Sequence, residues 1–180
     1  MNETDYYPEI KLYFENKFRQ RFPTCELYAG IGNLESFFAI LPQDRNVLRE
    51  ALADYVSIKA DITFVVYNPE NGKHVLLLVE VKVKNFTLMQ FSQLNGYLVT
   101  TGCNLGLLVN IDADLSQDFA LILGHKPELL DYAVWQGTLE RSIKIGLCTW
   151  NTTTQRITFV GFNPINTIDA LYKLLQDNLR

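Results

Sequence analysis

The sequence predicts an α/β fold, in which a central mixed β-sheet is flanked by helices within a single domain spanning residues 1–180. Two observations carry this prediction. Segments 61–67 and 75–83 are rich in β-branched and aromatic residues and are separated by the turn-forming segment 68–73, which is the pattern of an antiparallel hairpin. A strand–helix–strand pattern follows up to residue 111, and such a unit is expected to be parallel and right-handed. A sheet that contains both kinds of pairing is mixed.

The remaining elements are predicted from apolar periodicity and from helix-end signals. Helices are expected at 8–21, 45–56, 87–101, 127–137 and 167–179. Further strands are expected at 24–29, 105–111, 143–150 and 156–162. Segments 34–41 and 119–123 are apolar but too short to classify. For the helix after the hairpin, Thr87 and Gln90 match a capping box, and Gly102 suits the position just beyond its end.

Composition places the chain among ordinary globular proteins. A length of 180 residues suits one domain with a substantial core, and 48% hydrophobic with 20% charged residues is typical of such domains. No membrane span is expected, because no run of 18 apolar residues exists. The first residues lack the features of a signal peptide, and the three cysteines have neither a metal-binding nor a disulfide spacing. We therefore expect a cytoplasmic location.

The hairpin is expected to gather three charged side chains. If it folds between Glu70 and Asn71, the numbers of facing positions sum to 141, so Asp61 lies opposite Glu80 with Cβ atoms roughly 5 Å apart. Lys82 comes two residues after Glu80 and therefore points to the same face. The apolar run before Glu80 is typical of a strand covered on both faces, so these charges end a central strand, where they are commonly paired or bind a metal.

Two chemical interpretations follow from this cluster. Two close carboxylates repel one another unless something neutralises them, and a divalent ion such as Mg²⁺ would do so. A lysine beside that ion can orient or deprotonate a water, which completes the minimum equipment for metal-assisted hydrolysis of a phosphodiester. The alternative is an ion-pair cluster at a sheet edge that has no catalytic role.

Residues 8–111 resemble the PD-(D/E)XK nuclease superfamily. Asp61 matches the aspartate of the motif, with Ala60 where proline is frequent, and Glu80-Val81-Lys82 matches the (D/E)XK element. The resemblance implies a restriction-endonuclease-like fold and a deoxyribonuclease that depends on Mg²⁺ or Mn²⁺. It implies that Asp61, Glu80 and the carbonyl of Val81 hold the metal and that Lys82 positions or activates water. The implied context is DNA restriction, repair, recombination or mobile-DNA processing.

The same resemblance extends to residues on two helices. The first helix of the superfamily often carries a glutamate that reaches the metal, and Glu15 is the candidate here, ahead of Glu9 and Glu26. Gln93 and Tyr97 match the Gln-x-x-x-Tyr element of RecB-like branches, where they help to hold the site and the nucleic-acid backbone. From the residues alone, Glu15 also fits a solvated helix charge, Gln93 a partly exposed helix glutamine, and Tyr97 a core residue with a hydroxyl partner.

The charge balance bears on the partner. A net charge of −4 disfavours a strong whole-surface nucleic-acid binder, although several lysines around the hairpin leave a local basic rim for DNA. The second hypothesis is therefore a nuclease-like fold that binds nucleic acid or protein without catalysis. A third is a subunit that obtains DNA recognition from a partner protein or from a second copy in a homodimer. Metal binding separates the first hypothesis from the second.

Overall fold

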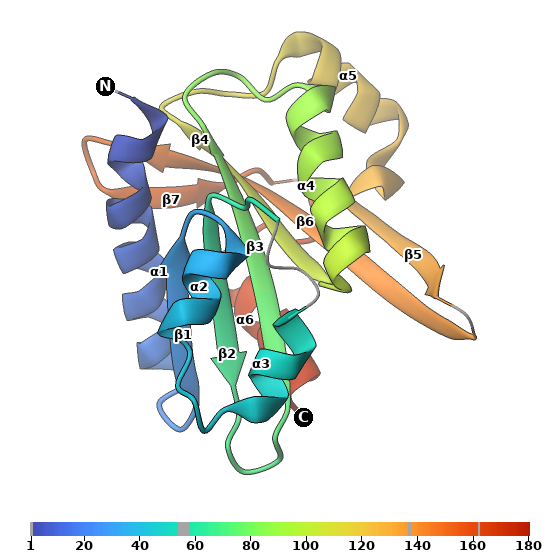
Figure 1. The fold of residues 1–180 in the computed structure, drawn as a ribbon. Coiled ribbons are helices and arrows are strands. Elements are labelled where there is room, and N and C mark those ends of the chain that lie inside the picture. The colour runs from blue at the N-terminus through green and yellow to red at the C-terminus, as the bar shows by residue number, and fades with distance from the viewer. Residues whose placement is uncertain (1, 54–57, 137, 162) are drawn as a thin grey trace.

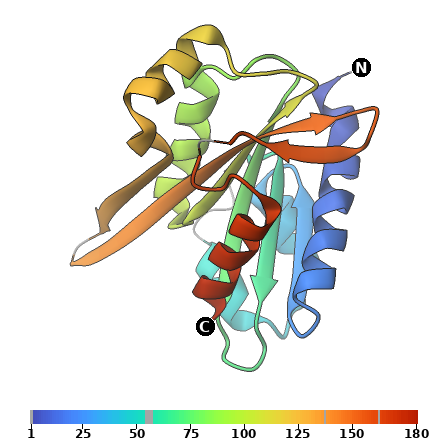
Figure 2. The ribbon, with the colours of Figure 1, turned by 180° about the vertical axis from the view of Figure 1, so that it is seen from behind.

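The computed structural model describes residues 2–53, 58–136, 138–161 and 163–180. Within these residues the chain forms an α/β structure in which one mixed sheet of seven strands lies between two layers of helices (Figures 1 and 2). The elements in chain order are η1 (Glu3–Tyr6), α1 (Tyr7–Arg21), β1 (Glu26–Ile31), α2 (Leu34–Ile40), α3 (Asn46–Ala53), β2 (Ile62–Tyr67), β3 (His74–Lys82), α4 (Leu88–Thr101), β4 (Leu105–Ile111), α5 (Gln117–His125), η2 (Pro127–Leu130), β5 (Asp131–Gln136), β6 (Leu139–Asn151), β7 (Arg156–Phe159) and α6 (Ile168–Leu179).

The sheet combines an antiparallel half with a parallel centre. Its strand order is β1-β2-β3-β4-β6-β5, and β7 pairs with the far part of β6. Strands β1, β2 and β3 pair antiparallel to one another. Strands β3, β4 and β6 pair in parallel, and β5 and β7 run antiparallel to β6. The predicted hairpin and the predicted strand–helix–strand unit, β3–α4–β4, are therefore both present.

Alternation along β3 divides the core into two apolar clusters. Leu77, Val79 and Val81 face the cluster that includes α1 and α6, whereas Leu76 and Leu78 face the cluster that includes α2 and α4. Burial on both faces explains why this strand reads as an unbroken apolar run. By the same alternation, the side chains that follow Leu78 on its face are those of the charged residues at the end of the strand.

The C-terminal half corrects one prediction. The helix expected at 127–137 is wrong: residues 127–130 form a 3-10 turn, and residues 131–136 form the edge strand β5. Tyr132, Val134 and Trp135 are strand-favouring residues, and pairing with β6 supplies backbone hydrogen bonds along one side of the strand. The unclassified apolar segments are the helices α2 and α5. Helix α3 begins within the expected segment 45–56, whose last turn lies outside the described residues.

No helix within residues 2–53, 58–136, 138–161 and 163–180 is long and apolar enough to cross a membrane.

Candidate active site

The register of the central hairpin is the one expected from its turn. Ile62 pairs with Val79 and Thr63 with Leu78, so the numbers of facing positions sum to 141. Gly72 has a φ of +74°, a conformation that glycine adopts without the steric cost that other residues incur, and it closes the turn. Because Asp61 comes directly before β2 and Glu80 directly after Val79, the two carboxylates meet at the open end of the hairpin.

The ammonium group of Lys82 lies at the centre of this cluster. Its Nζ is 2.8 Å from Oε1 of Glu80, 3.1 Å from Oε1 of Glu3 and 3.6 Å from Oδ2 of Asp61. Asp61 is fixed in turn by the backbone N–H of Val81, which donates to Oδ2 at 2.8 Å. Lys82 therefore contacts both of the other residues matched to the (D/E)XK pattern, and the carboxylates of Asp61 and Glu80 converge on this one cationic group.

Burial and neighbouring charges shift the pKa values of Glu80, Asp61 and Lys82. Burial and the neighbouring charge of Asp61 raise the pKa of Glu80 to about 7. Burial likewise raises the pKa of Asp61, although the N–H of Val81 and the charge of Lys82 oppose the shift. For Lys82, burial disfavours the charged form, but the hydrogen bond to Glu80 and the charges of both carboxylates prevail and raise its pKa. Lys82 is therefore an ammonium at neutral pH, while Glu80 is poised between its two forms.

One oxygen of Glu80 has no hydrogen-bond donor among the residues that the structure describes. The side chain is 1% exposed, Oε1 is paired with Lys82, and Oε2 is buried without a hydrogen-bond partner. A buried carboxylate oxygen that lacks a donor carries a desolvation penalty, and binding a hard divalent cation would offset this penalty. With Asp61 across the hairpin, the donor set fits such an ion in its chemistry. The described residues form no group of three or more His, Cys, Asp or Glu side chains arranged to hold a metal.

Glu3 is the member of the cluster that sequence reasoning missed. It lies in η1, and the hydroxyl of Tyr7, one helical turn later, donates to its Oε1 at 2.9 Å. Burial raises the pKa of Tyr7, and the neighbouring carboxylates of Asp61 and Glu3 add to this shift, so Tyr7 stays neutral and its single hydroxyl proton is donated to one of these two carboxylates at a time. The one sequence feature that links Glu3 to Tyr7 is their i, i+4 spacing, which places two side chains on the same face of a helix. Residues 1–6 have no apolar periodicity, so the sequence does not show which way that face points.

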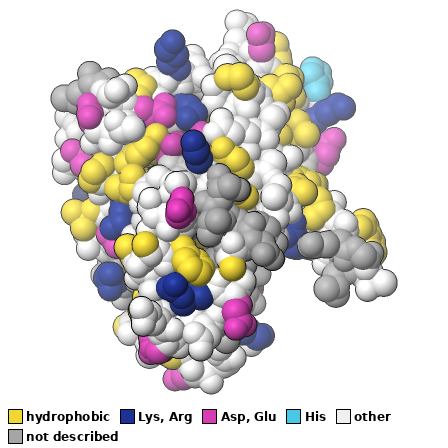
Figure 3. Space-filling view, viewed as in Figure 1, with side chains coloured by type: hydrophobic (Ala, Val, Ile, Leu, Met, Phe, Trp, Pro, Cys, Tyr) yellow, Lys and Arg dark blue, Asp and Glu magenta, His cyan; other side chains and the backbone are white. Residues whose placement is uncertain are grey.

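Glu15, the expected helix glutamate, is engaged elsewhere. Lys11 Nζ lies 2.9 Å and Arg19 3.9 Å from its carboxylate oxygens, so Glu15 forms ion pairs within α1, with a side chain that is 15% exposed. It lines a shallow groove between α1 and α2, where exposed hydrophobic side chains such as Leu12 and Ile40 gather (left of Figure 3). The glutamate from the N-terminal helical segment that contacts Lys82 is thus Glu3 and not Glu15. The weaker alternative Glu26 pairs with Arg45 at 2.5 Å.

Gln93 and Tyr97 lie together on α4. The side-chain amide of Gln93 donates to the hydroxyl of Tyr97 at 3.2 Å. Gln93 is exposed, and Tyr97 packs partly buried against the apolar cluster that α4 shares with the sheet. The capping box expected at Thr87 and Gln90 is present, and Gly102 ends the helix in a left-handed conformation. Helix α4 begins six residues after Lys82 in the chain. Its Gln93–Tyr97 pair is at least partly exposed to solvent.

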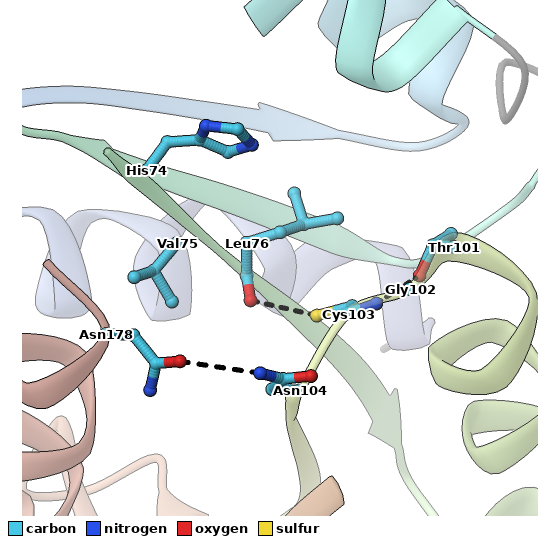
Figure 4. A pocket seen from close by; sticks show the side chains of 8 residues that line it. All are labelled: His74, Val75, Leu76, Thr101, Gly102, Cys103, Asn104 and Asn178. Atoms are coloured by element: carbon cyan, nitrogen blue, oxygen red, sulfur yellow. Dashed lines mark hydrogen bonds between the residues drawn. The ribbon is translucent and has the colours of Figure 1, made fainter. Parts of the chain in front are cut away.

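A small pocket lies at the opposite end of β3. His74, Cys103 and Asn104 line it, at the start of β3 and just before β4, so it is at the amino ends of the parallel strands (Figure 4). The thiol of Cys103 donates to the carbonyl of Leu76 at 2.8 Å, and Asn104 donates to Asn178 at 3.4 Å. Burial lowers the pKa of His74. The pocket is remote from the charged cluster, which lies at the carboxyl end of β3.

Comparisons of the chain with protein-family models, with curated proteins and with solved structures gave no match.

Proposed function

We propose that the protein is a metal-dependent deoxyribonuclease with a restriction-endonuclease-like fold. The observation that carries the proposal is the buried Glu80 carboxylate, which has one oxygen without a donor, faces Asp61 and contacts Lys82. The group lies at the carboxyl end of a parallel strand, which is where α/β sheets bind ligands. Strongly perturbed, charge-coupled groups at such a position favour a functional site over a structural one.

In this proposal Asp61 and Glu80 hold Mg²⁺ or Mn²⁺, with the carbonyl of Val81 assisting. When bound, the ion supplies positive charge to the phosphate that is attacked. Lys82 acts as a hydrogen-bond donor that orients the attacking water or stabilises charge on a phosphate oxygen, because its raised pKa keeps it protonated. Glu3 and Tyr7 hold Lys82 and Asp61 in place. Gln93 and Tyr97 orient the substrate backbone from α4.

A second candidate is a nuclease-like fold that binds DNA or a partner protein without cutting. The observation that favours it is the position of the Lys82 ammonium, which already contacts all three carboxylates and offsets part of their charge without a metal. The two proposals differ in what Mg²⁺ does to the folded protein. A nuclease binds the ion at Glu80 and Asp61, whereas an inert cluster does not bind it.

The test is a cleavage assay on plasmid, linear and single-stranded DNA in Mg²⁺, Mn²⁺ or EDTA. Wild type is compared with Asp61→Asn and Lys82→Ala, and Lys84→Ala serves as the matched control, because Lys84 is an exposed lysine two residues from Lys82. We expect metal-dependent cleavage that both site variants lose and the control retains. Cleavage that survives Asp61→Asn would point to a contaminant. No cleavage by a folded preparation that also binds no Mg²⁺ in calorimetry would favour the inert cluster.

A further inference from the structure

A row of polar side chains crosses the sheet beside Lys82. In the parallel ladder Lys82 is paired with Asn110 of β4, and Asn110 is paired with Thr149 of β6. Paired residues of neighbouring strands point to the same face, so Asn110 is the next side chain across the sheet from the candidate catalytic lysine. The charged cluster therefore continues into the parallel half of the sheet as a line of uncharged polar groups.

A cavity of about 250 Å³ lies over Asn110 and Thr149. Apolar side chains from the loops after β3 and β4, from α5 and from the segment after β7 form its walls: Phe86, Leu115, Ala120 and Val160. Phe86 and Leu115 are joined by a β-bridge, which holds the two loops together over the strand ends. The volume is below the roughly 300–1,000 Å³ of pockets that take drug-sized ligands, so it suits a single ring.

The polar groups of this cavity accept hydrogen bonds. Asn110 is 1% exposed, and its Nδ2 donates to the carbonyl of Asp114 at 2.7 Å, which fixes the orientation of the amide. Its Oδ1 is buried and has no hydrogen-bond partner within the described parts of the chain. The hydroxyl of Thr149 donates to the carbonyl of Ala113 at 3.2 Å, so toward the cavity it offers only lone pairs. A ligand that leaves Oδ1 unpaired gains little here, and a ligand that donates to it removes a desolvation cost.

We propose that this cavity takes a one-ring nucleobase that carries an exocyclic amino group, the pattern of cytosine. The identification of the ligand as a base of the substrate strand rests on the proposed nuclease function, whereas the need for a donor rests on Asn110 alone. The apolar walls accommodate the flat ring, and Oδ1 of Asn110 accepts from the amino group. Uracil has a carbonyl oxygen at the same ring position, which would face the Asn110 oxygen as a second acceptor.

The experiment measures binding in EDTA, so that its outcome does not depend on cleavage. The probes are two fluorescent single-stranded oligothymidylates that differ at one central position, cytosine in one and uracil in the other, together with free deoxycytidine and deoxyuridine. We expect the full chain to bind the cytosine strand at least about tenfold more tightly, since one base-specific contact gives discrimination of this order. Asn110→Leu should remove the preference while leaving the uracil strand bound as before.

Ala120→Leu is the second variant, because it fills the cavity from α5 without removing a buried polar group. Ala133→Leu is the matched control, since Ala133 is exposed on the edge strand β5. Loss of the preference in Ala120→Leu with retention in Ala133→Leu supports the site even if Asn110→Leu fails to fold. Equal binding of the two strands by wild type overturns the proposal, as does a preference that survives both cavity variants. A preference shown by the free nucleosides alone overturns the link to a substrate strand.

Discussion

Replacing Glu80 with glutamine should stabilise the protein at alkaline pH. The folded-state pKa of Glu80 is raised from 4.5 to about 7, so the folded protein favours the protonated side chain. The stabilisation that this group contributes is fully present below pH 4.5 and is lost as the pH rises through about 7. At about 1.4 kcal/mol per pH unit, the difference between these two pKa values corresponds to about 3 kcal/mol of unfolding free energy. Glutamine is neutral throughout and has no such loss.

The expected result is a pH-dependent gap between Glu80→Gln and wild type. In EDTA the two proteins should have similar unfolding free energies near pH 4.5, and at pH 8 the variant should be more stable by up to about 3 kcal/mol, or about 6–12 °C in melting temperature. Urea denaturation at several pH values measures the gap directly. Glu70→Gln is the control, because Glu70 is exposed in the turn of the same hairpin, and its gap should stay within about 0.5 kcal/mol at every pH.

A metal arm of the same experiment separates the proposed functions. Mg²⁺ that binds at Glu80 and Asp61 should raise the stability of wild type at pH 8 and leave Glu80→Gln nearly unchanged, because only the folded wild type has the carboxylate pair. Binding should weaken as the pH falls below about 7, where Glu80 takes up its proton. The burial argument is refuted if the gap between wild type and Glu80→Gln is the same at pH 4.5 and pH 8.

Three further substitutions test Glu3 and the two ends of α4. Glu3→Gln should lower the free energy of unfolding by less than about 1 kcal/mol, because the ion pair of Glu3 with Lys82 is partly exposed. A double-mutant cycle with Lys82 measures the coupling energy, and a value above about 1 kcal/mol would contradict this expectation. Thr87→Ala should cost about 1 kcal/mol in urea denaturation through loss of the cap of α4, and no change would contradict the capping box. Gly102→Ala should also destabilise the protein by about 1 kcal/mol or more, because the φ of Gly102 is +70° and an added Cβ would lie 2.9 Å from Nη1 of Arg141. An unchanged free energy of unfolding would contradict the left-handed conformation at this helix end.

The sequence was most informative where local chemistry and burial agree. The turn between β2 and β3 needs residues that tolerate positive φ, and the apolar faces of both strands permit only one register, so the position of Asp61 opposite Glu80 could be worked out in advance. The same holds for α4, where Thr87, Gln90 and Gly102 mark both ends. These features are determined by residues near one another in the chain.

What the sequence could not predict depends on contacts between distant segments. Glu3 joins Lys82 across nearly 80 positions, and nothing near Glu3 indicates that partner. Glu15 was favoured by the resemblance to the nuclease superfamily, but Lys11 and Arg19 lie four residues before and after it, at the helical spacing that lets them form ion pairs with it. Strand β5 was mistaken for a helix because Pro127 resembles a helix start, whereas pairing with β6 decides its conformation.

The two oxygens of Glu80 bear differently on the choice between a structural cluster and a metal site. Oε1 contacts Lys82, as either interpretation requires, but Oε2 is buried with no donor, and a cluster whose only role were structural would gain from a neutral side chain there. Burial and Asp61 raise the pKa of Glu80, so its ionised carboxylate weakens the fold above pH 7. A functional role explains why the protein keeps such a group, because a bound cation would compensate for this cost. If wild type stays less stable than Glu80→Gln at pH 8 even in saturating Mg²⁺, this argument for a metal site fails.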